Sequence, residues 1–394
     1  MNSFCCRCAL LALLLGLGGA GQAQGVKARA APPVPYQAVD ARMRQVPDSA
    51  TRSVRGLARY INASFSTEPD KARAAFGWVA RHIRYDVDHR YRLELERETT
   101  EVAQETLVKR RGVCQHYAGL YSALANQAGV LTYVVPGYSS LRDPIGHAWC
   151  ASRINGQWYL MDPTWAAGRV IKNKFTFRFN NDYFMVRPAV FIESHMPFDP
   201  LWQLLKEPRT PQQFQLGTKP NTPSPPFAFA DSVAAYVRQS LAQQLRSSSR
   251  RVEQNGVKSN LIFSHLNYLR SRKENCQIDI FNAANQAYND GAQKLNDFML
   301  FFNHQFLPGQ ADAELLLLLP PVAASFIRSR ELLTTVRTYN PALLASMKDL
   351  QESLQEGEIS LGKSLAFVDR YVHAPKLLRP TLFMNPGNLN TTPK

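Results

Sequence analysis

Three residues whose side chains can act together as an activated thiol nucleophile lie in three separate segments of residues 111–165. Cys114 opens an apolar-periodic segment, His147 lies in a strand-like run, and Asp162 ends the next such run. A cysteine attacks a carbonyl carbon when an imidazole manages its proton and a carboxylate orients that imidazole. The residue types therefore predict acyl transfer through a thioester, with Cys114 as nucleophile, His147 as base and Asp162 as orienting acid.

The segment that begins at Cys114 has the periodicity of a helix. Apolar or aromatic residues follow at helical spacing, and Gly129 is a natural stop. Cys114 would then lie at the helix N-terminus, where free amides and the macrodipole favour a thiolate. Gly112, just before it, allows a tight chain entry and close approach of a substrate backbone. The periodic residues are Tyr117, Tyr121, Leu124 and Ala128.

A β-hairpin is predicted to bring His147 and Asp162 together. Asn155-Gly156, the strongest short signal for a two-residue turn, joins two strand-like runs. Counting back from that turn pairs Trp149 with Asp162, so His147 becomes the diagonal neighbour of Asp162 on the same face. Diagonal partners lie roughly 7–8 Å apart at the backbone, within reach of an imidazole and a carboxylate. The predicted strands cover residues 131–135, 147–154 and 157–162.

Two other histidines compete with His147 for the role of base. His116 lies two residues from Cys114, which on a helix points it away from the sulfur, so packing around the site is predicted for it. His89 lies among charges in a surface loop predicted over residues 86–97, a stretch for which solvation is favoured over substrate reading. Neither has an acid across a hairpin, so His147 is favoured.

An oxyanion forms during acyl transfer and needs two hydrogen-bond donors. The backbone amide of Cys114 is predicted as one, because it begins a helix. Gln104, which is polar and upstream, is the candidate for the other. The residues placed near the site without a catalytic role are Gly112, Trp149 and Trp165.

These motifs together resemble the transglutaminase-like superfamily of papain-type thiol enzymes. Gly-Val-Cys opening a helix, then Gly-His-Ala-Trp, then Asp-Pro-Thr-Trp follow in order over residues 112–165. Further matches over residues 83–86 and 182–205 point to the branch that is similar to kyphoscoliosis peptidase and its bacterial relatives. The resemblance covers residues 35–207 and implies the same triad.

An α+β fold follows from this resemblance: a transglutaminase-like, papain-like catalytic domain with an antiparallel sheet and N-terminal helices, followed by an α-helical bundle domain. Prolines cluster after the catalytic domain, which indicates a linker. The predicted order is signal peptide (1–23), flexible lead-in (24–40), catalytic domain (41–207), Pro-rich linker (208–226), α-helical domain (227–374) and loose tail (375–394).

The helical domain is predicted from a seven-residue repeat of apolar residues over residues 278–304, which indicates a helix packed lengthwise on another. Two sets of residues are candidates for the partner helix. They are Val233, Val237, Leu241 and Leu245, or Leu365, Val368 and Val372.

Residues 1–23 have the features of a secretory signal: Arg7 precedes an apolar run, and small residues lead to a cut after Ala23. An exported protein in the periplasm or outside the cell is therefore predicted, with no transmembrane segment after cleavage. Three cysteines then remain, an odd number that fits a free Cys114. A disulfide between Cys150 and Cys276 is possible, and the sequence does not decide whether it forms.

The formal net charge of +15 over 394 residues is compatible with a polyanionic partner such as an envelope surface. The basic residues are spread along the chain without a nucleic-acid-binding motif, so nucleic acid is excluded as a partner and a solvated basic surface is favoured. No cofactor or metal is predicted.

The predicted function is that of an exported cysteine-nucleophile amide hydrolase, of peptidase or amidase type, acting on a protein or peptide. Animal crosslinking transglutaminases, by resemblance, carry extra β-domains and calcium sites, and no acidic calcium loop occurs here. Hydrolysis is therefore favoured over crosslinking. A catalytically silent envelope scaffold is the third alternative, and the presence of all three triad residues argues against it.

Overall fold

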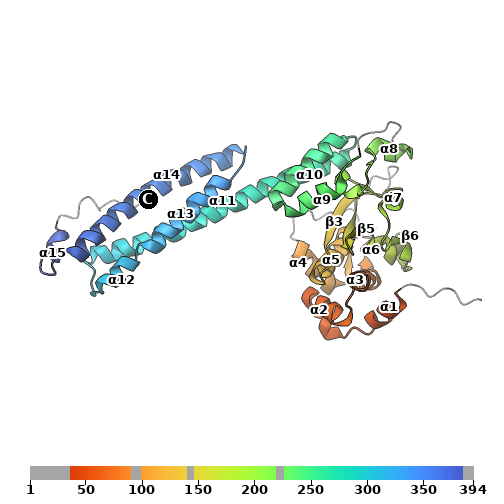
Figure 1. The fold of residues 1–394 in the computed structure, drawn as a ribbon, viewed down its shortest axis with the longest axis horizontal. Helices are drawn as coiled ribbons and strands as arrows, with labels where there is room; N and C mark the ends of the chain where they lie inside the picture. The colour runs from red at the N-terminus through yellow and green to blue at the C-terminus, as the bar shows by residue number, and fades with distance from the viewer. Residues whose placement is uncertain (1–35, 90–98, 140–145, 219–225, 385–394) are drawn as a thin grey trace, which may run out of the picture.

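A computed structural model of the chain describes residues 36–89, 99–139, 146–218 and 226–384 (Figure 1). A body of helices around a small sheet holds the predicted catalytic residues, and one long helix leads from it into a helical arm (Figure 1). The predicted signal peptide lies outside the described residues, as do most of the lead-in and residues 90–98 of the predicted loop.

Helices precede the sheet, as predicted. The Thr67 side chain accepts a hydrogen bond from the Asp70 amide at the start of α3, followed by an early proline. Phe76, Trp78 and other central residues of α3 are fully buried. The elements are α1 (Gln37–Met43), η1 (Asp48–Arg52), α2 (Val54–Ser64), α3 (Glu68–His82) and α4 (Thr99–Lys109).

The prediction of a flexible lead-in is wrong for its last residues, because α1 begins at Gln37 and is anchored by a charge. Asp40 accepts hydrogen bonds from Arg73 Nε at 2.8 Å and Nη2 at 2.7 Å, and from Arg81 Nη2 at 2.8 Å. The Arg73 side chain is only 1% exposed, so Asp40 supplies the charge that this guanidinium needs inside the protein.

Asp40→Ala is expected to lower the free energy of unfolding by about 3 kcal/mol, because it leaves the Arg73 guanidinium buried without its counterion. Urea titration followed by circular dichroism measures the change. Asp349→Ala, an exposed position on the distal arm, is the matched control and is expected to stay within about 0.5 kcal/mol of the wild type. Equal destabilisation by the two variants would contradict the role of Asp40 as the counterion of the buried Arg73 guanidinium.

The predicted antiparallel sheet is confirmed, in the strand order β5-β4-β3-β8. Its hairpin has the predicted register, with Ile154 opposite Gln157. Asn155 and Gly156 both have positive φ, 50° and 79°, the conformation that a two-residue type I′ turn requires. The strands are β3 (Thr132–Tyr138), β4 (Gly146–Ile154), β5 (Gln157–Met161) and β8 (Met196–Pro197), and α5 (Cys114–Gln127) packs against β3 and β4.

Short elements complete the body. β6 (Gly168–Ile171) and β7 (Lys174–Phe177) form a separate two-stranded sheet, in which Phe177 is 52% exposed. The others are β1 (Arg84–Tyr85), β2 (Arg111–Gly112), α6 (Pro163–Ala167), η2 (Asn181–Tyr183), α7 (Pro188–Phe191), η3 (Pro200–Gln203) and α8 (Pro211–Leu216).

The predicted linker is not extended chain throughout, because α8 lies inside it. The segment before α8 is also fixed: Gln203 Nε2 donates to the Arg209 carbonyl and Gln203 Oε1 accepts from the Arg209 amide, both at 2.7 Å. The Arg209 guanidinium pairs with Glu193 of the body. Residues 219–225 of the predicted linker lie outside the described residues.

The C-terminal region is helical as predicted, but it is not one bundle (Figure 1). The start of α11 and α10 pack on the body, where Val252, Ile262 and Leu266 share a core with Tyr138 and Phe198. The rest of α11 forms a separate core with later helices. The elements are α9 (Phe229–Arg238), α10 (Leu241–Asn255), α11 (Asn260–Asn303), α12 (Asp312–Leu317), α13 (Pro320–Thr335), α14 (Pro341–His373) and α15 (Arg379–Leu382).

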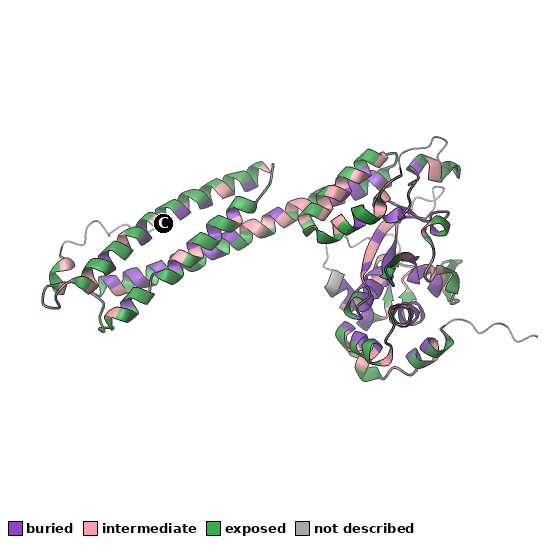
Figure 2. Ribbon diagram, in the orientation of Figure 1, coloured by how far each residue is buried: buried purple, intermediate pink, exposed green. Residues whose placement is uncertain are grey.

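The predicted partners of the seven-residue repeat are partly wrong. The main partner of α11 is α13, whose Phe326 ring lies directly against Gly291 and Gly357 on the two neighbouring helices. A Cβ on Gly291 would meet that ring at 2.7 Å, so close packing requires glycine there. Figure 2 shows the buried residues of the arm facing inward. Of the predicted partner residues, Val237, Leu241 and Leu365 are exposed, and Val233 packs on the sheet.

The predicted loose tail is docked over its first residues. Arg379 forms two hydrogen bonds with the Asp312 carboxylate, at 2.6 and 2.8 Å, and Phe383 packs on the core of the arm. Residues 385–394 of the predicted tail lie outside the described residues. Within the part of the chain that the structure describes, no helix is both long and apolar enough to cross a membrane.

Candidate active site

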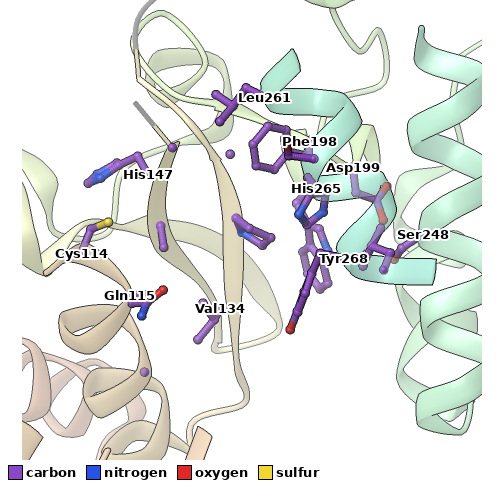
Figure 3. A pocket seen from close by; sticks show the side chains of 18 of the residues that line it. Cys114, Gln115, Val134, His147, Phe198, Asp199, Ser248, Leu261, His265 and Tyr268 are labelled. Carbon is purple, nitrogen blue, oxygen red and sulfur yellow. The ribbon is translucent and has the colours of Figure 1, made fainter. Parts of the chain in front are cut away.

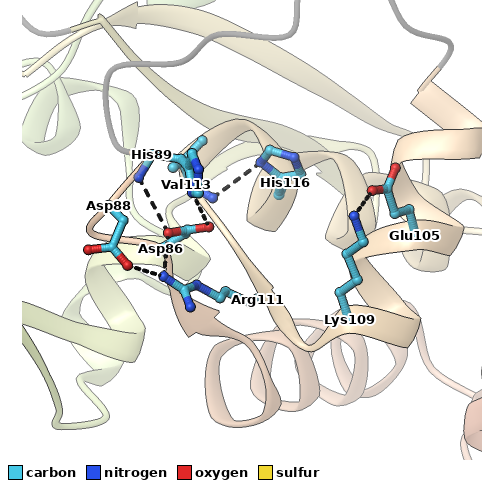
Figure 4. Close-up of polar contacts among 8 residues, drawn as sticks. All are labelled: Asp86, Asp88, His89, Glu105, Lys109, Arg111, Val113 and His116. Carbon is cyan, nitrogen blue, oxygen red and sulfur yellow. Dashed lines mark hydrogen bonds and ion pairs between the residues drawn. The ribbon is translucent and has the colours of Figure 1, made fainter.

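The segment that leads into Cys114 is fixed by polar contacts (Figure 4). The Arg111 guanidinium donates to Asp86 at 2.7 Å and to Asp88 at 2.5 Å. The Val113 amide donates to His116 Nδ1 at 3.2 Å, which closes the first turn of α5. His116 therefore supports the start of the helix, while His89 contacts Asp86 in an exposed position.

Cys114 is the first residue of α5 and has a free thiol that is 5% exposed. Cys114 lines the same cavity as His147, and Figure 3 shows the sulfur and the imidazole facing each other. No disulfide joins Cys150 to Cys276. Cys150 is buried and its Sγ lies 3.2 Å from the Ala118 carbonyl oxygen, so it packs behind the site.

Asp162 holds the other side of the His147 ring. Its Oδ2 lies 2.8 Å from His147 Nε2. Its Oδ1 accepts hydrogen bonds from the amides of Thr164 at 2.8 Å and Trp165 at 3.0 Å, because Asp162 caps the N-terminus of α6. Since Nε2 is engaged by the carboxylate, Nδ1 is the nitrogen left to face the sulfur.

The two charges stabilise each other strongly. Burial alone would lower the pKa of His147, but the Asp162 charge and the hydrogen bonds to Asp162 and Cys114 outweigh it and raise that pKa to about 10. Burial opposes ionisation of Asp162 as well, yet His147 and His195 hold its pKa below the usual range. An imidazolium at neutral pH can give a proton to a leaving amine, and it favours a thiolate beside it.

The titration of His147 is therefore expected near pH 10 in the wild type. Asp162→Asn should move it to lower pH, because the variant removes the negative charge that stabilises the imidazolium. NMR titration of the His147 Cε1–H resonance measures both values. Asp349→Asn, which changes an exposed carboxylate on the distal arm, is the control. An unchanged titration midpoint in Asp162→Asn would show that the Asp162 carboxylate does not cause the raised pKa of His147.

Sequence reasoning missed His195, which also binds the orienting acid. Its Nε2 lies 3.1 Å from Asp162 Oδ2 and its Nδ1 lies 2.7 Å from Ser194 Oγ. Burial lowers the pKa of His195 despite its contact with Asp162, so a neutral ring donates through Nε2. The ring stacks on Phe191 at 3.9 Å between centroids. Asp162 Oδ2 thus accepts from two imidazoles.

His147, Asp162 and His195 place three possible metal-ligand atoms within 4.8 Å of one another. Imidazole and carboxylate ligands of this kind occur in zinc and iron sites. Here both imidazoles direct Nε2 to the same carboxylate oxygen at hydrogen-bonding distance. Together with the thiol next to His147, this arrangement favours a hydrogen-bonded triad.

The prediction for Gln104 is wrong. Its Oε1 accepts from the Val54 amide at 3.0 Å and its Nε2 donates to the Arg52 carbonyl at 3.1 Å, so it fastens α4 to the start of α2. Gly112 is buried, and a Cβ there would lie 2.5 Å from the Cβ of His116, so packing explains the glycine.

The two predicted tryptophans surround the histidines. The Trp165 ring lies 5.6 Å from His147 and 4.5 Å from His195 between centroids. Trp149 is fully buried, with its ring 5.1 Å from His195 between centroids, and within the described residues its Nε1 has no hydrogen-bond partner. Both rings limit the positions that the imidazoles can adopt.

Gln115, which follows the cysteine, is another residue that sequence reasoning missed. Among the described residues its Nε2 is buried without a hydrogen-bond partner, and the residue lines a cavity of about 340 Å³ beside Cys114 and His147 (Figure 3). A buried amide donor without a partner is uncommon and invites a functional explanation.

A wider cavity of about 1120 Å³ lies on the other side of His147. Its lining combines Trp165 and Tyr183 with cations of the β6–β7 region. These cations are Arg169, Lys172 and Arg178. His147 lines both cavities, so each gives access to the same imidazole.

Residues 55–163 match the family model of the Transglutaminase-like superfamily. The human kyphoscoliosis peptidase is 38% identical over 160 residues, 38% of this chain and 24% of the relative. Hillarin of Drosophila melanogaster is 23% identical over 201 residues, 46% of this chain and 24% of the relative. The chain thus spans about a quarter of the length of these curated relatives. A TGase crystal structure is 19% identical with a TM-score of 0.23, covering 40% of each chain.

Proposed function

This chain contains a transglutaminase-like domain, and from that premise we propose that it is a thiol enzyme that hydrolyses amide bonds in a protein or peptide. The observation that carries the proposal is the buried Asp162–His147 pair, which adjoins a free thiol at the N-terminus of α5. The name peptidase given to the human relative favours hydrolysis over transfer to an amine.

In the proposed reaction the Cys114 thiolate attacks the substrate carbonyl carbon, and the carbonyl electron pair moves onto oxygen. The His147 imidazolium then protonates the departing amine as the carbon–nitrogen bond breaks and a thioester remains. Water attacks the thioester and gives one proton to His147. The carboxylic acid leaves and the thiolate returns, so Asp162 faces the same imidazolium at the start and end of the cycle.

Two donors are proposed for the oxyanion of this reaction. The first is the backbone amide of Cys114, which belongs to the open N-terminal turn of α5. The second is Gln115 Nε2, which replaces Gln104 in this role because it is buried without a partner in the part of the chain that the structure describes, and because its residue lines the same cavity as Cys114.

Iodoacetamide labelling near neutral pH tests the proposal, with mass spectrometry to assign each labelled cysteine. Cys114 is expected to react much faster than Cys276, which is partly exposed on α11. His147→Ala should slow the labelling of Cys114, and Cys114→Ala verifies its assignment. If Cys114 is labelled no faster than Cys276, and His147→Ala leaves its labelling rate unchanged, the enzymatic function is contradicted and the catalytically silent scaffold is supported instead.

Hydrolysis and crosslinking are separated by incubating the protein with carboxymethylated lysozyme, with and without cadaverine. New amino termini or released carboxylates without incorporated cadaverine support the hydrolase. Incorporation of cadaverine at glutamine, with release of ammonia, would instead identify an acyltransferase.

Export to the periplasm or the outside of the cell is also proposed, because residues 1–23 have the composition of a secretory signal. Envelope proteins would then be available substrates, and the basic surface could contact polyanions there. Fractionation of cells that express the full chain tests this, with the mass of the recovered protein showing whether the first 23 residues are removed.

A further inference from the structure

We infer that the cavity beside Cys114 is a specificity pocket that accepts an uncharged apolar or aromatic side chain flanking the reacting carbonyl. This inference rests on the proposed function, since it names the substrate class of that same site. It also gives α10 and the start of α11 a role in substrate selection.

The position of the cavity connects it to the chemistry. Cys114, Gln115 and His147 all line it, so a group that fills it lies next to the attacking sulfur (Figure 3). Its volume of about 340 Å³ is at the lower end of the range for small-ligand pockets. One large side chain is a suitable occupant, whereas a folded domain is not.

The far wall of the cavity comes from helices outside the residues that match the family model. Leu245 of α10 and Leu261 of α11 line the cavity together with Val134 of β3, and both leucines lie outside residues 55–163. This wall is held to the body by His265, whose ring stacks on Phe198 at 4.4 Å between centroids. The pocket is therefore composite, with catalytic residues on one side and α10 and α11 on the other.

The charges near the pocket are already balanced. Asp199 lines it, but both carboxylate oxygens accept hydrogen bonds from Arg251 at 2.7 Å. Burial lowers the pKa of His265 to about 4, so this ring is neutral at physiological pH. Apart from His147, the described lining residues offer no free charge, and a charged substrate side chain would lose its hydration without gaining a counterion from them.

Peptidyl acyloxymethyl ketones test the inference, with Phe, Leu, Ser, Asp or Lys next to the reactive group. The Phe and Leu probes are expected to alkylate Cys114 at least about tenfold faster than the others, since burial of a large apolar side chain favours binding by that much. Equal rates across the series, or a preference for a charged probe, would overturn the inference.

A negative charge placed in the pocket should weaken the preference for the apolar probe over the Lys probe. Leu261→Asp is expected to lower the ratio of Phe-probe to Lys-probe rates by at least about tenfold. Asp is tolerated in the first turn of a helix, so the start of α11 is preserved. Phe263→Asp is the matched control: Phe263 is 51% exposed, does not line the pocket, and should leave the ratio unchanged.

Ser264→Trp provides a second variant in case Leu261→Asp fails to fold. Ser264 is exposed at the edge of the pocket, and a large side chain there should slow the Phe probe more than iodoacetamide. The two proposals fail differently. If Cys114 does not react with iodoacetamide, the proposed enzymatic function is wrong. If Cys114 reacts, but its rate depends neither on the probe side chain nor on Leu261→Asp, only the proposed specificity pocket is wrong.

Discussion

Asp162→Asn is expected to lower the rate of amide hydrolysis by about 10³- to 10⁴-fold. The asparagine has nearly the same shape and can still accept from the Thr164 and Trp165 amides through its oxygen. It then presents NH₂ to His147 where the carboxylate presents Oδ2. The imidazole loses the acceptor that fixes its tautomer and the charge that keeps it protonated.

The measurement is kcat/KM on the peptide that the wild type cleaves fastest. Asp349→Asn, which changes an exposed carboxylate on the distal arm, should remain within about twofold of the wild type. A loss smaller than about tenfold in Asp162→Asn would mean that the acid contributes only to packing. Circular dichroism spectra of the two variants should match, so that loss of folding is distinguished from loss of chemistry.

Gln115→Leu is expected to lower kcat by about 10²- to 10³-fold, the usual cost of removing one oxyanion donor. Leucine keeps the bulk of the side chain and removes the donor, so KM should change little because the lost contact forms only in the transition state. Alkylation of Cys114 by iodoacetamide passes through no oxyanion and should proceed at the wild-type rate.

Gln127→Leu is the control for this variant, since it makes the same change at an exposed position near the other end of α5. It should leave kcat unaltered. If Gln115→Leu slows alkylation as much as hydrolysis, then Gln115 supports the position of the thiol and the oxyanion assignment is wrong.

The contact between His147 and Asp162 could be predicted because short-range rules determine it. A two-residue Asn155-Gly156 turn fixes the pairing register of the two strands, and that register determines which side chains share a face of the sheet. The helix that starts at Cys114 is similarly local, since periodicity and Gly129 define both ends. These predictions required no knowledge of distant segments.

His195 could not be predicted in the same way, because it lies 33 residues after Asp162 and reaches it through α7 and the turn that follows. Gln104 illustrates the opposite error: it is polar and near the site in sequence, yet its amide meets the start of α2. Spacing within one element carries no information about such contacts.

The arm shows the same limit on a larger scale. The seven-residue repeat correctly indicated a long helix that packs along its length. Its partner α13 was missed, because the fit between Phe326 and Gly291 depends on the shape of two surfaces rather than on either sequence alone. The division of the helical region into two cores follows from that same fit and from the pairing of Arg251 with Asp199.

The 44 residues of α11 form one uninterrupted rod, about 66 Å long, with the pocket wall at one end and the arm at the other. A rod without a joint transmits torque. A molecule that binds and rotates the distal arm would therefore rotate Leu261 and His265 about the axis of α11. The shape of the pocket beside Cys114 would then depend on the force applied to the arm.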